Sequence, residues 1–169
     1  PITSTLQGLG AFPGEDNQFL GMLGMHGTYE ANNAMHDCDL MINIGARFDD
    51  RITGKIDEFS PKSKKIHIDI DPSSINKNVN VDLAIVGDVK IVLKKIVSAI
   101  YKKYPNFVDS NKQGISSWWN KIEIWRKKNS LSYSNSKEVI KPQYAVQRLY
   151  ELTKAQDTFI TTEVGQHQM

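Results

Sequence analysis

The chain has 169 residues, which is enough for one domain with a substantial core and a shorter appendage. Hydrophobic residues make up 40% of it and charged residues 24%, a composition that excludes an intrinsically disordered protein. The net charge is +2, from 21 basic and 19 acidic side chains, and this balance argues against a nucleic-acid partner. No apolar run approaches the roughly 20 residues of a membrane span, so we expect no membrane partner.

The chain contains one cysteine, Cys38, so no disulfide can form within it. This favours a reducing compartment such as the cytoplasm. Asp37 and Asp39 flank the thiol, and neighbouring carboxylates disfavour a thiolate. We therefore interpret Cys38 as a buried helix residue and not as a nucleophile.

The first 104 residues have the pattern of an α/β domain. Three short apolar runs, at 40–44, 66–70 and 84–86, predict buried strands. Residues 28–37 and 88–104 have helical periodicity, the second with apolar residues on one face and lysines on the other. Strands that alternate with helices predict a parallel sheet flanked by helices, similar to a Rossmann fold.

The segment 105–141 is expected to be a linker that contains a tryptophan-rich helix. Trp118, Trp119 and Trp125 recur at helical spacing. Such a stripe can stack on nucleobases, but no basic groove accompanies it, so we interpret it as the surface that docks the helix on a domain. Beyond the linker, Pro142 is suited to the first turn of a helix over 142–153, and residues 158–162 predict a strand.

Polar or glycine-bearing turns follow the predicted strands, where α/β sheets bind their ligands. The Gly24–His26 turn with Gly27 can approach an anion, although it can equally be a helix cap formed by Thr28. Arg47 and Arg51 flank two aspartates after the strand at 40–44. Arginine suits a diphosphate and carboxylates suit ribose hydroxyls, whereas the simpler alternative is a surface ion-pair cluster.

Acidic residues follow the other two predicted strands. Asp69 and Asp71 come at the end of the strand at 66–70, and Asp88 follows the strand at 84–86. Carboxylates at such strand ends commonly accept hydrogen bonds from a ribose. Together the strand ends predict a crevice of the size of a dinucleotide. No GxGxxG fingerprint accompanies it, and the histidines and Cys38 have no metal-ligand spacing, so we predict no catalytic residue and no metal site within this chain.

Five sequence motifs, in the same order, resemble the large subunit of acetolactate synthase (acetohydroxyacid synthase). They cover nearly the whole chain: residues 5–10 (TLQGLG), 20–27 (LGMLGMHG), 45–51 (GARFDDR), 67–72 (HIDIDP) and 164–169 (VGQHQM). The resemblance implies a thiamine-diphosphate enzyme of three domains, of which this chain would be one part. Residues 1–104 would be the middle domain that binds FAD, 105–141 a linker, and 142–169 the start of the thiamine-diphosphate domain.

The resemblance also implies roles for individual residues. FAD would contact a set of residues at the strand ends: Thr5, Leu6, Gln7, Met25, His26, Gly27, Gly45, Arg47, Asp49, Arg51, Asp69, Ile70, Asp71 and Asp88. The substrate channel would be lined by Met25, Asp50 and Arg51. Thiamine diphosphate would meet Gly165, Gln166 and His167. Asn43 and Glu163 depart from the family pattern.

For the parent enzyme, the resemblance implies thiamine diphosphate and Mg²⁺ as further cofactors and 2-keto acids as substrates. It implies a homodimer or tetramer, with a small regulatory subunit as a further partner, in the cytoplasm of a bacterium or an organelle of a eukaryote. The domain with the catalytic glutamate precedes the resembling segment, so we expect this chain to be inactive alone. Two alternatives stay open: a stand-alone nucleotide-binding or regulatory module, and another thiamine-diphosphate carboligase such as glyoxylate carboligase.

Overall fold

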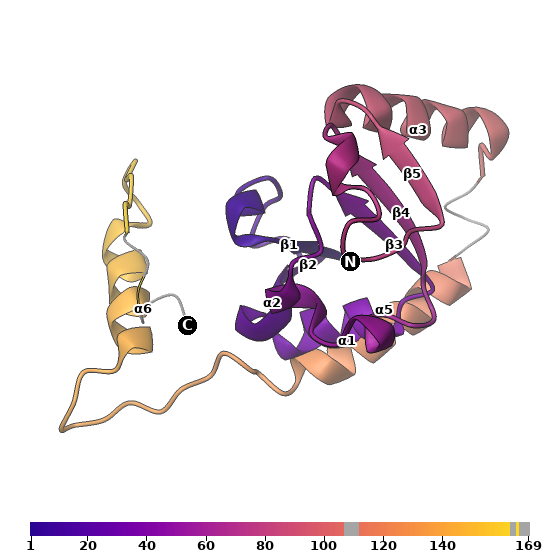
Figure 1. Ribbon diagram of the computed structural model, residues 1–169. Coiled ribbons are helices and arrows are strands. Elements are labelled where there is room, and N and C mark those ends of the chain that lie inside the picture. The colour runs from indigo at the N-terminus through magenta and orange to yellow at the C-terminus, as the bar shows by residue number, and fades with distance from the viewer. Residues whose placement is uncertain (107–111, 163–164, 166–169) are drawn as a thin grey trace. The chain divides into compact units, whose positions relative to one another are not determined.

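The computed structural model describes residues 1–106, 112–162 and 165 (Figure 1). The chain forms two compact units, Pro1–Lys128 and Asn129–Met169. The boundary between them falls within the segment 105–141 that was expected to be a linker, and the tryptophan-rich helix belongs to the first unit.

A three-stranded parallel sheet organises the first unit. Its strands are β3 (Leu40–Ile44), β4 (Lys64–Asp69) and β5 (Leu83–Val86), in the order β3-β4-β5. Helices flank the sheet, as Figure 1 shows, so the predicted α/β class with a parallel sheet is confirmed. The strand bounds differ from the sequence prediction by at most two residues at either end.

Two further strands were not predicted from the sequence. They are β1 (Ile2–Ser4) and β2 (Phe19–Met22), which form a separate parallel pair. Each has only three or four residues, and Gly21 interrupts β2 at a φ of 88°. Strands this short do not produce the apolar run or the alternation on which a sequence prediction depends.

The helices begin where the sequence supplies capping groups. Thr28 caps α1 (Tyr29–Asp37) by accepting a hydrogen bond from the Ala31 N–H, and Asp88 caps α3 (Val89–Lys103) in the same way. The remaining helical elements are η1 (Leu6–Gly8), η2 (Gly24–His26), α2 (Asp50–Thr53), η3 (Ile56–Glu58), η4 (Pro72–Ser74), α5 (Lys112–Arg126) and α6 (Pro142–Thr153).

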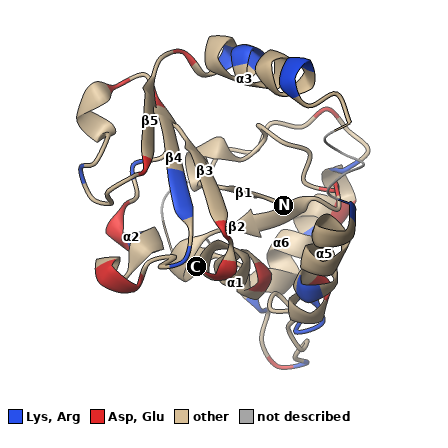
Figure 2. Ribbon diagram, turned by 90° about the vertical axis from the view of Figure 1, so that its right-hand side faces the viewer, with Lys and Arg blue, Asp and Glu red and all other residues tan. Residues whose placement is uncertain are grey.

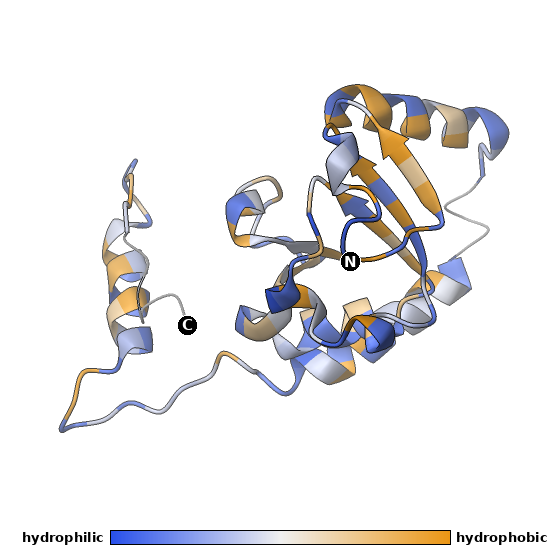
Figure 3. Cartoon of the chain, viewed as in Figure 1, coloured by the Kyte–Doolittle hydropathy of each residue, from blue (hydrophilic) through white to orange (hydrophobic). Residues whose placement is uncertain are grey.

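The two faces of the sheet differ in how well they are covered. One face carries Met41 and Asn43 of β3. Helices and loops cover this face around the buried cluster Phe48, Phe59 and Val79. On the other face, Ile68 is buried, but Ile42 is 53% exposed. Figure 3 shows that apolar residues lie along the strands and on α3. The lysines of α3 appear in blue in Figure 2.

The expectation of fully buried strands was therefore wrong for β3 and β5. Leu40, Ile42 and Ile44 are all exposed, whereas the polar Asn43 is buried and donates a hydrogen bond to the Ala46 carbonyl at 2.6 Å. For β3 the physical reason is the alternation of side chains along a strand, because the layer that covers the sheet there lies on the face of Asn43. Strand β5 lies at the other edge of the sheet and is exposed on both faces, with only Ile85 half-buried.

The tryptophan-rich helix α5 packs on α1 and β2. Ile122 is completely buried among Leu20, Ala31 and Ala34, and Trp118, Trp119 and Trp125 surround this cluster. These contacts agree with the interpretation of the stripe as a docking surface. The Lys121 ammonium and the Asp37 carboxylate join the two helices at 2.7 Å, and this hydrogen bond lowers the pKa of Asp37.

The second unit contains α6, which begins at Pro142 as predicted. Residues 158–162 do not form the predicted strand, and Phe159 is 91% exposed. A strand needs a neighbour for its backbone hydrogen bonds, and the described part of the chain provides none for this segment.

None of the helices formed by the described residues has both the length and the apolar character of a membrane span.

Candidate functional site

The glycine turn after β2 is held against α2 by direct backbone contact. Gly24 has a φ of 84°, and a Cβ at this position would lie 2.8 Å from the Ile52 Cα and still closer to the Arg51 carbonyl oxygen. Only glycine fits such a conformation at such a distance. The turn thereby brings Met25, which is 67% exposed, next to the beginning of α2.

The segment after β3 carries the arginine and aspartate residues of the predicted site. The Arg47 guanidinium donates to the Asp49 carboxylate at 2.8 Å, and both side chains are exposed. The Asn78 amide donates to the carbonyl oxygens of Arg47 and Phe48 at 3.0 and 3.1 Å, and so fixes this segment from the loop before β5. Arg47 and Asp49 thus form the surface ion pair that was the simpler alternative to a diphosphate site, and this pair lies just after the carboxyl end of β3.

The ends of β4 and β5 present carboxylates. Asp69 is buried and its carboxylate accepts a hydrogen bond from the Asp71 N–H at 2.9 Å, while Ile70 between them is 72% exposed. Asp71 accepts two hydrogen bonds from Ser73, and these lower the pKa of its carboxyl. Asp88 comes just after β5 and caps α3.

The remaining predicted contacts lie elsewhere in the chain. Thr5, Leu6 and Gln7 follow β1, and the Thr5 hydroxyl accepts from the Gly8 N–H at 3.1 Å. Gly165 is half-buried in the second unit. Gln166 and His167 lie outside the described residues, so their predicted contacts with thiamine diphosphate stay predictions.

The predicted FAD residues of the first unit thus lie at or after the carboxyl ends of strands, three of which form the parallel sheet β3-β4-β5 and two the separate parallel pair β1-β2. This is where open α/β sheets bind nucleotides. The arrangement offers an exposed guanidinium after β3, carboxylates after β4 and β5, and an exposed apolar side chain at Ile70. Such a set suits a diphosphate, the hydroxyls of a ribose and the flat face of a base.

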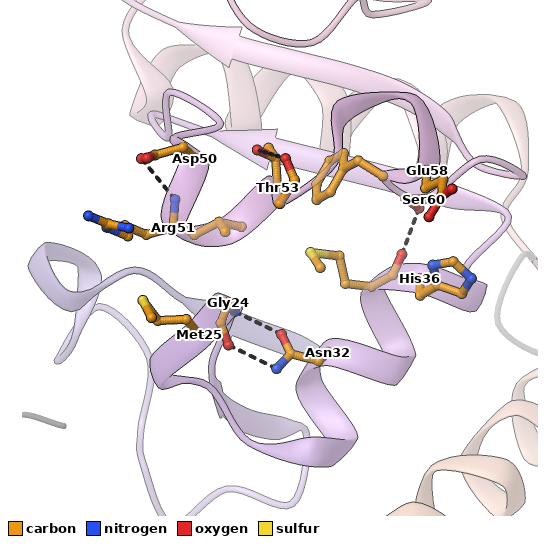
Figure 4. A pocket seen from close by; sticks show the side chains of 13 residues that line it. Gly24, Met25, Asn32, His36, Asp50, Arg51, Thr53, Glu58 and Ser60 are labelled. Atoms are coloured by element: carbon orange, nitrogen blue, oxygen red, sulfur yellow. Dashed lines mark hydrogen bonds between the residues drawn. The ribbon is translucent and has the colours of Figure 1, made fainter.

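A pocket of about 430 Å³ lies between the glycine turn and α1 on one side and α2 and η3 on the other (Figure 4). Met25 and Arg51 lie at one end of it, and His36, Glu58 and Ser60 lie at the other. The three residues predicted to face a substrate channel, Met25, Asp50 and Arg51, all line this pocket.

Two residues of this region were missed by sequence reasoning. The Asn32 side chain bonds both backbone groups of Gly24, and nothing in the sequence distinguishes it from Asn33 beside it. His67 is completely buried, and among the residues that the structure describes neither of its ring nitrogens has a hydrogen-bond partner; Nε2 lies 3.6 Å from the Asp69 carboxylate. Among the described residues, no group of three acidic, histidine or cysteine side chains is arranged to hold a metal ion.

The family model that matches the chain is described as thiamine pyrophosphate enzyme, central domain, and it covers residues 1–96. This is more than half of the chain, and it includes all five strands. The chain therefore belongs to the central-domain family of the thiamine pyrophosphate enzymes.

Among its curated relatives are acetolactate synthase large subunits. The chain is 48% identical over its whole length to the one from Haemophilus influenzae, and it covers 29% of that protein. It is 45% identical to the isozyme 3 large subunit of Escherichia coli, again over its whole length and 29% of the relative. The large subunit from Cyanidium caldarium is 46% identical, with 28% covered. The chain thus spans less than a third of the relatives it matches, and the resemblance inferred from the motifs is confirmed.

Proposed function

We propose that this chain is the FAD-binding part of an acetolactate synthase large subunit. The single observation that carries the proposal is the convergence of Arg47, Asp69 and Asp88 at neighbouring parallel strand ends. The likeness to acetolactate synthases over all 169 residues supports it. The same likeness favours an acetolactate synthase over glyoxylate carboligase and over a stand-alone nucleotide-binding module.

In the proposed binding mode, FAD lies along the strand ends. Gly45, Arg47, Asp49 and Arg51 hold the diphosphate and the ribitol. Asp69, Ile70, Asp71 and Asp88 hold the adenosine end, Thr5, Leu6 and Gln7 lie along the flavin, and Met25, His26 and Gly27 contact FAD at the glycine turn. The residues fit such a ligand, because Arg47 is 67% exposed and Gly45, with a φ of 65°, has open space where a side chain would project.

The parent enzyme would condense two pyruvates, or pyruvate and 2-ketobutyrate, with loss of CO₂, in the biosynthesis of branched-chain amino acids. Thiamine diphosphate, with Mg²⁺, supplies the electron sink for this chemistry when bound. The contribution of this chain is to bind and orient: Arg51 anchors a keto-acid carboxylate, and Met25 and Asp50 shape the pocket beside it. We propose that the chain alone is inactive.

For the parent we further propose assembly as a homodimer or tetramer with a small regulatory subunit, in the cytoplasm of a bacterial cell or an organelle of a eukaryotic one. Gly165, Gln166 and His167 would be contacts to thiamine diphosphate in that assembly. Size measurement of the full-length protein, with and without thiamine diphosphate, tests the proposed homodimer or tetramer.

The first test of the proposed function is a titration of the 169-residue chain with FAD, followed by flavin absorbance and fluorescence. We expect saturable binding, and an Arg47→Ala variant that binds at least tenfold more weakly, because a charged hydrogen bond to phosphate contributes about 1.5–3 kcal/mol. Arg148→Ala is the matched control, since Arg148 is also an exposed arginine in an ion pair, with Glu151, but lies in the second unit.

Absence of FAD binding by a chain that circular dichroism shows to be folded would contradict the proposal for this chain. Equal binding by wild type and Arg47→Ala would contradict the strand-end site. Turnover of pyruvate by the full-length parent, with none by the 169-residue chain, is the expected result of the activity assay.

A further inference from the structure

The Asn32 side chain holds Gly24 of the glycine turn by both of its backbone groups. Its amide oxygen accepts a hydrogen bond from the Gly24 N–H at 2.7 Å, and its amide nitrogen donates to the Gly24 carbonyl at 2.9 Å. Figure 4 shows both bonds. An amide can satisfy a donor and an acceptor at once, and this pairing uses both ends of the Asn32 amide.

Gly24 is the point at which the turn touches α2. Its positive φ and the absence of a Cβ allow it to lie against the backbone of Arg51 and Ile52. Fixing Gly24 therefore fixes the adjacent Met25 relative to Arg51, and both residues line the same end of the pocket. Met25 itself is 67% exposed, so the fold does not position its side chain by burial.

Other contacts close the turn, but they involve the Gly24 carbonyl and Thr28 and not the Gly24 N–H. Gly27 N–H donates to the Gly24 carbonyl at 2.9 Å, and Thr28 bonds the carbonyl oxygens of Leu20 and Met22. These bonds close the turn and tie its end to β2. Within the described part of the chain, the Gly24 N–H donates to the Asn32 oxygen, which comes from α1 and so from outside the turn.

We propose that Asn32 is the positioning residue of the glycine turn, and that its two hydrogen bonds to Gly24 hold Met25 opposite Arg51 in the geometry that the ligand requires. This inference deepens the proposed function, since the ligand at this end of the pocket is taken to be FAD with its neighbouring keto acid. Asn32 does not touch the ligand and acts through Gly24.

The first test measures amide hydrogen exchange by NMR on the 169-residue chain without FAD. In Asn32→Ala, protection of the Gly24 amide is expected to fall at least tenfold, because its hydrogen-bond partner is lost. Amides of α5 are expected to keep their protection. The matched control is Asn33→Ala, since Asn33 lies on the same helix but bonds the Tyr29 carbonyl of that helix.

The second test is FAD affinity, with a rescue that a general loss of stability cannot imitate. Asn32→Asp keeps an oxygen for the Gly24 N–H, but at neutral pH it has no proton to donate to the Gly24 carbonyl. We expect FAD to bind about tenfold more weakly to this variant at about pH 7.5 and to recover partly at about pH 4, where a carboxyl with the ordinary aspartate pKa of about 3.9 is close to half protonated.

Asn32→Ala should bind weakly at both pH values. The charged groups that share the pocket are His36, Asp50, Arg51 and Glu58, and comparison with wild type at each pH removes their effect. Unchanged Gly24 protection in Asn32→Ala would overturn the proposal, and so would wild-type FAD affinity in both variants. If wild type bound no FAD, the proposed function would fail, while the exchange result alone would still decide whether Asn32 fixes the turn.

Discussion

Cys38 illustrates at the scale of one residue how neighbours set chemistry. It follows the last residue of α1 as its C-cap and is half-buried, so the predicted buried position within a helix was wrong. Its thiol donates to the Met35 carbonyl at 3.2 Å and lies 3.6 Å from the Ser60 hydroxyl. Burial raises the pKa of the thiol, and the Asp39 carboxylate raises it further, whereas the Ser60 hydrogen bond lowers it. The sequence had indicated a poor thiolate from the adjacent aspartates, and the structure shows that burial is the larger cause.

Because the folded thiol has a raised pKa, alkylation of Cys38 by iodoacetamide should show a midpoint at higher pH in the folded chain than in the urea-unfolded chain. Ser60→Ala should move the folded midpoint higher still, since it removes the hydrogen bond that favours the thiolate. Mass spectrometry of the alkylated fraction against pH provides the measurement. A folded midpoint at or below the unfolded one would contradict this account.

Packing of α5 shows what decides stability at the scale of an element. The helix has apolar residues at several positions, but Ile122 is completely buried while Ile124, two residues later, is 64% exposed. Residues two apart on a helix point in different directions, so the docking on α1 and β2 buries one and leaves the other in water.

Ile122→Ala should lower the free energy of unfolding by about 2–5 kcal/mol, because it leaves a cavity in the α1–α5 contact. Ile124→Ala on the same helix should change it by less than about 0.5 kcal/mol. Urea denaturation followed by tryptophan fluorescence can measure both, since Trp118, Trp119 and Trp125 surround the contact. Similar losses in the two variants would mean that α5 is not docked as described.

At the scale of the whole molecule, the chain is divided between two units of different character. The first contains the sheet, both buried clusters and the proposed FAD site. Residues 129–141 of the second unit have no helix or strand and are almost all exposed. Protease cleavage requires exposed backbone that can enter the active site of the protease, and this segment offers it.

Limited trypsin digestion should therefore cut first after Lys137 and leave a product that contains the whole first unit. The lysines of α3 are equally exposed, but they lie in a helix, whose hydrogen bonds must open before cleavage. Mass spectrometry of the early products identifies the sites. First cuts after Lys90 or Lys94 would contradict the division into units.

Periodicity and capping groups made most of the elements predictable. The apolar runs located β3, β4 and β5, Pro142 marked the start of α6, and Thr28 was identified as a capping residue. Strands β1 and β2 were missed because they are short, and residues 158–162 were assigned to a strand because their local pattern favours one. Whether such a segment finds a partner strand depends on the rest of the fold.

The sequence by itself determined the fold class and the family, because strand–helix alternation and the run from Gly45 to Arg51 are local features of the chain. It also identified which polar residues follow the strands. Only the tertiary structure decided that Asn32 holds Gly24, that Gly24 lies against Arg51, and that Asn43 is buried while Ile42 is exposed. These relations join segments that lie apart in the sequence or depend on which face of the sheet is covered, so they follow from packing and not from local pattern.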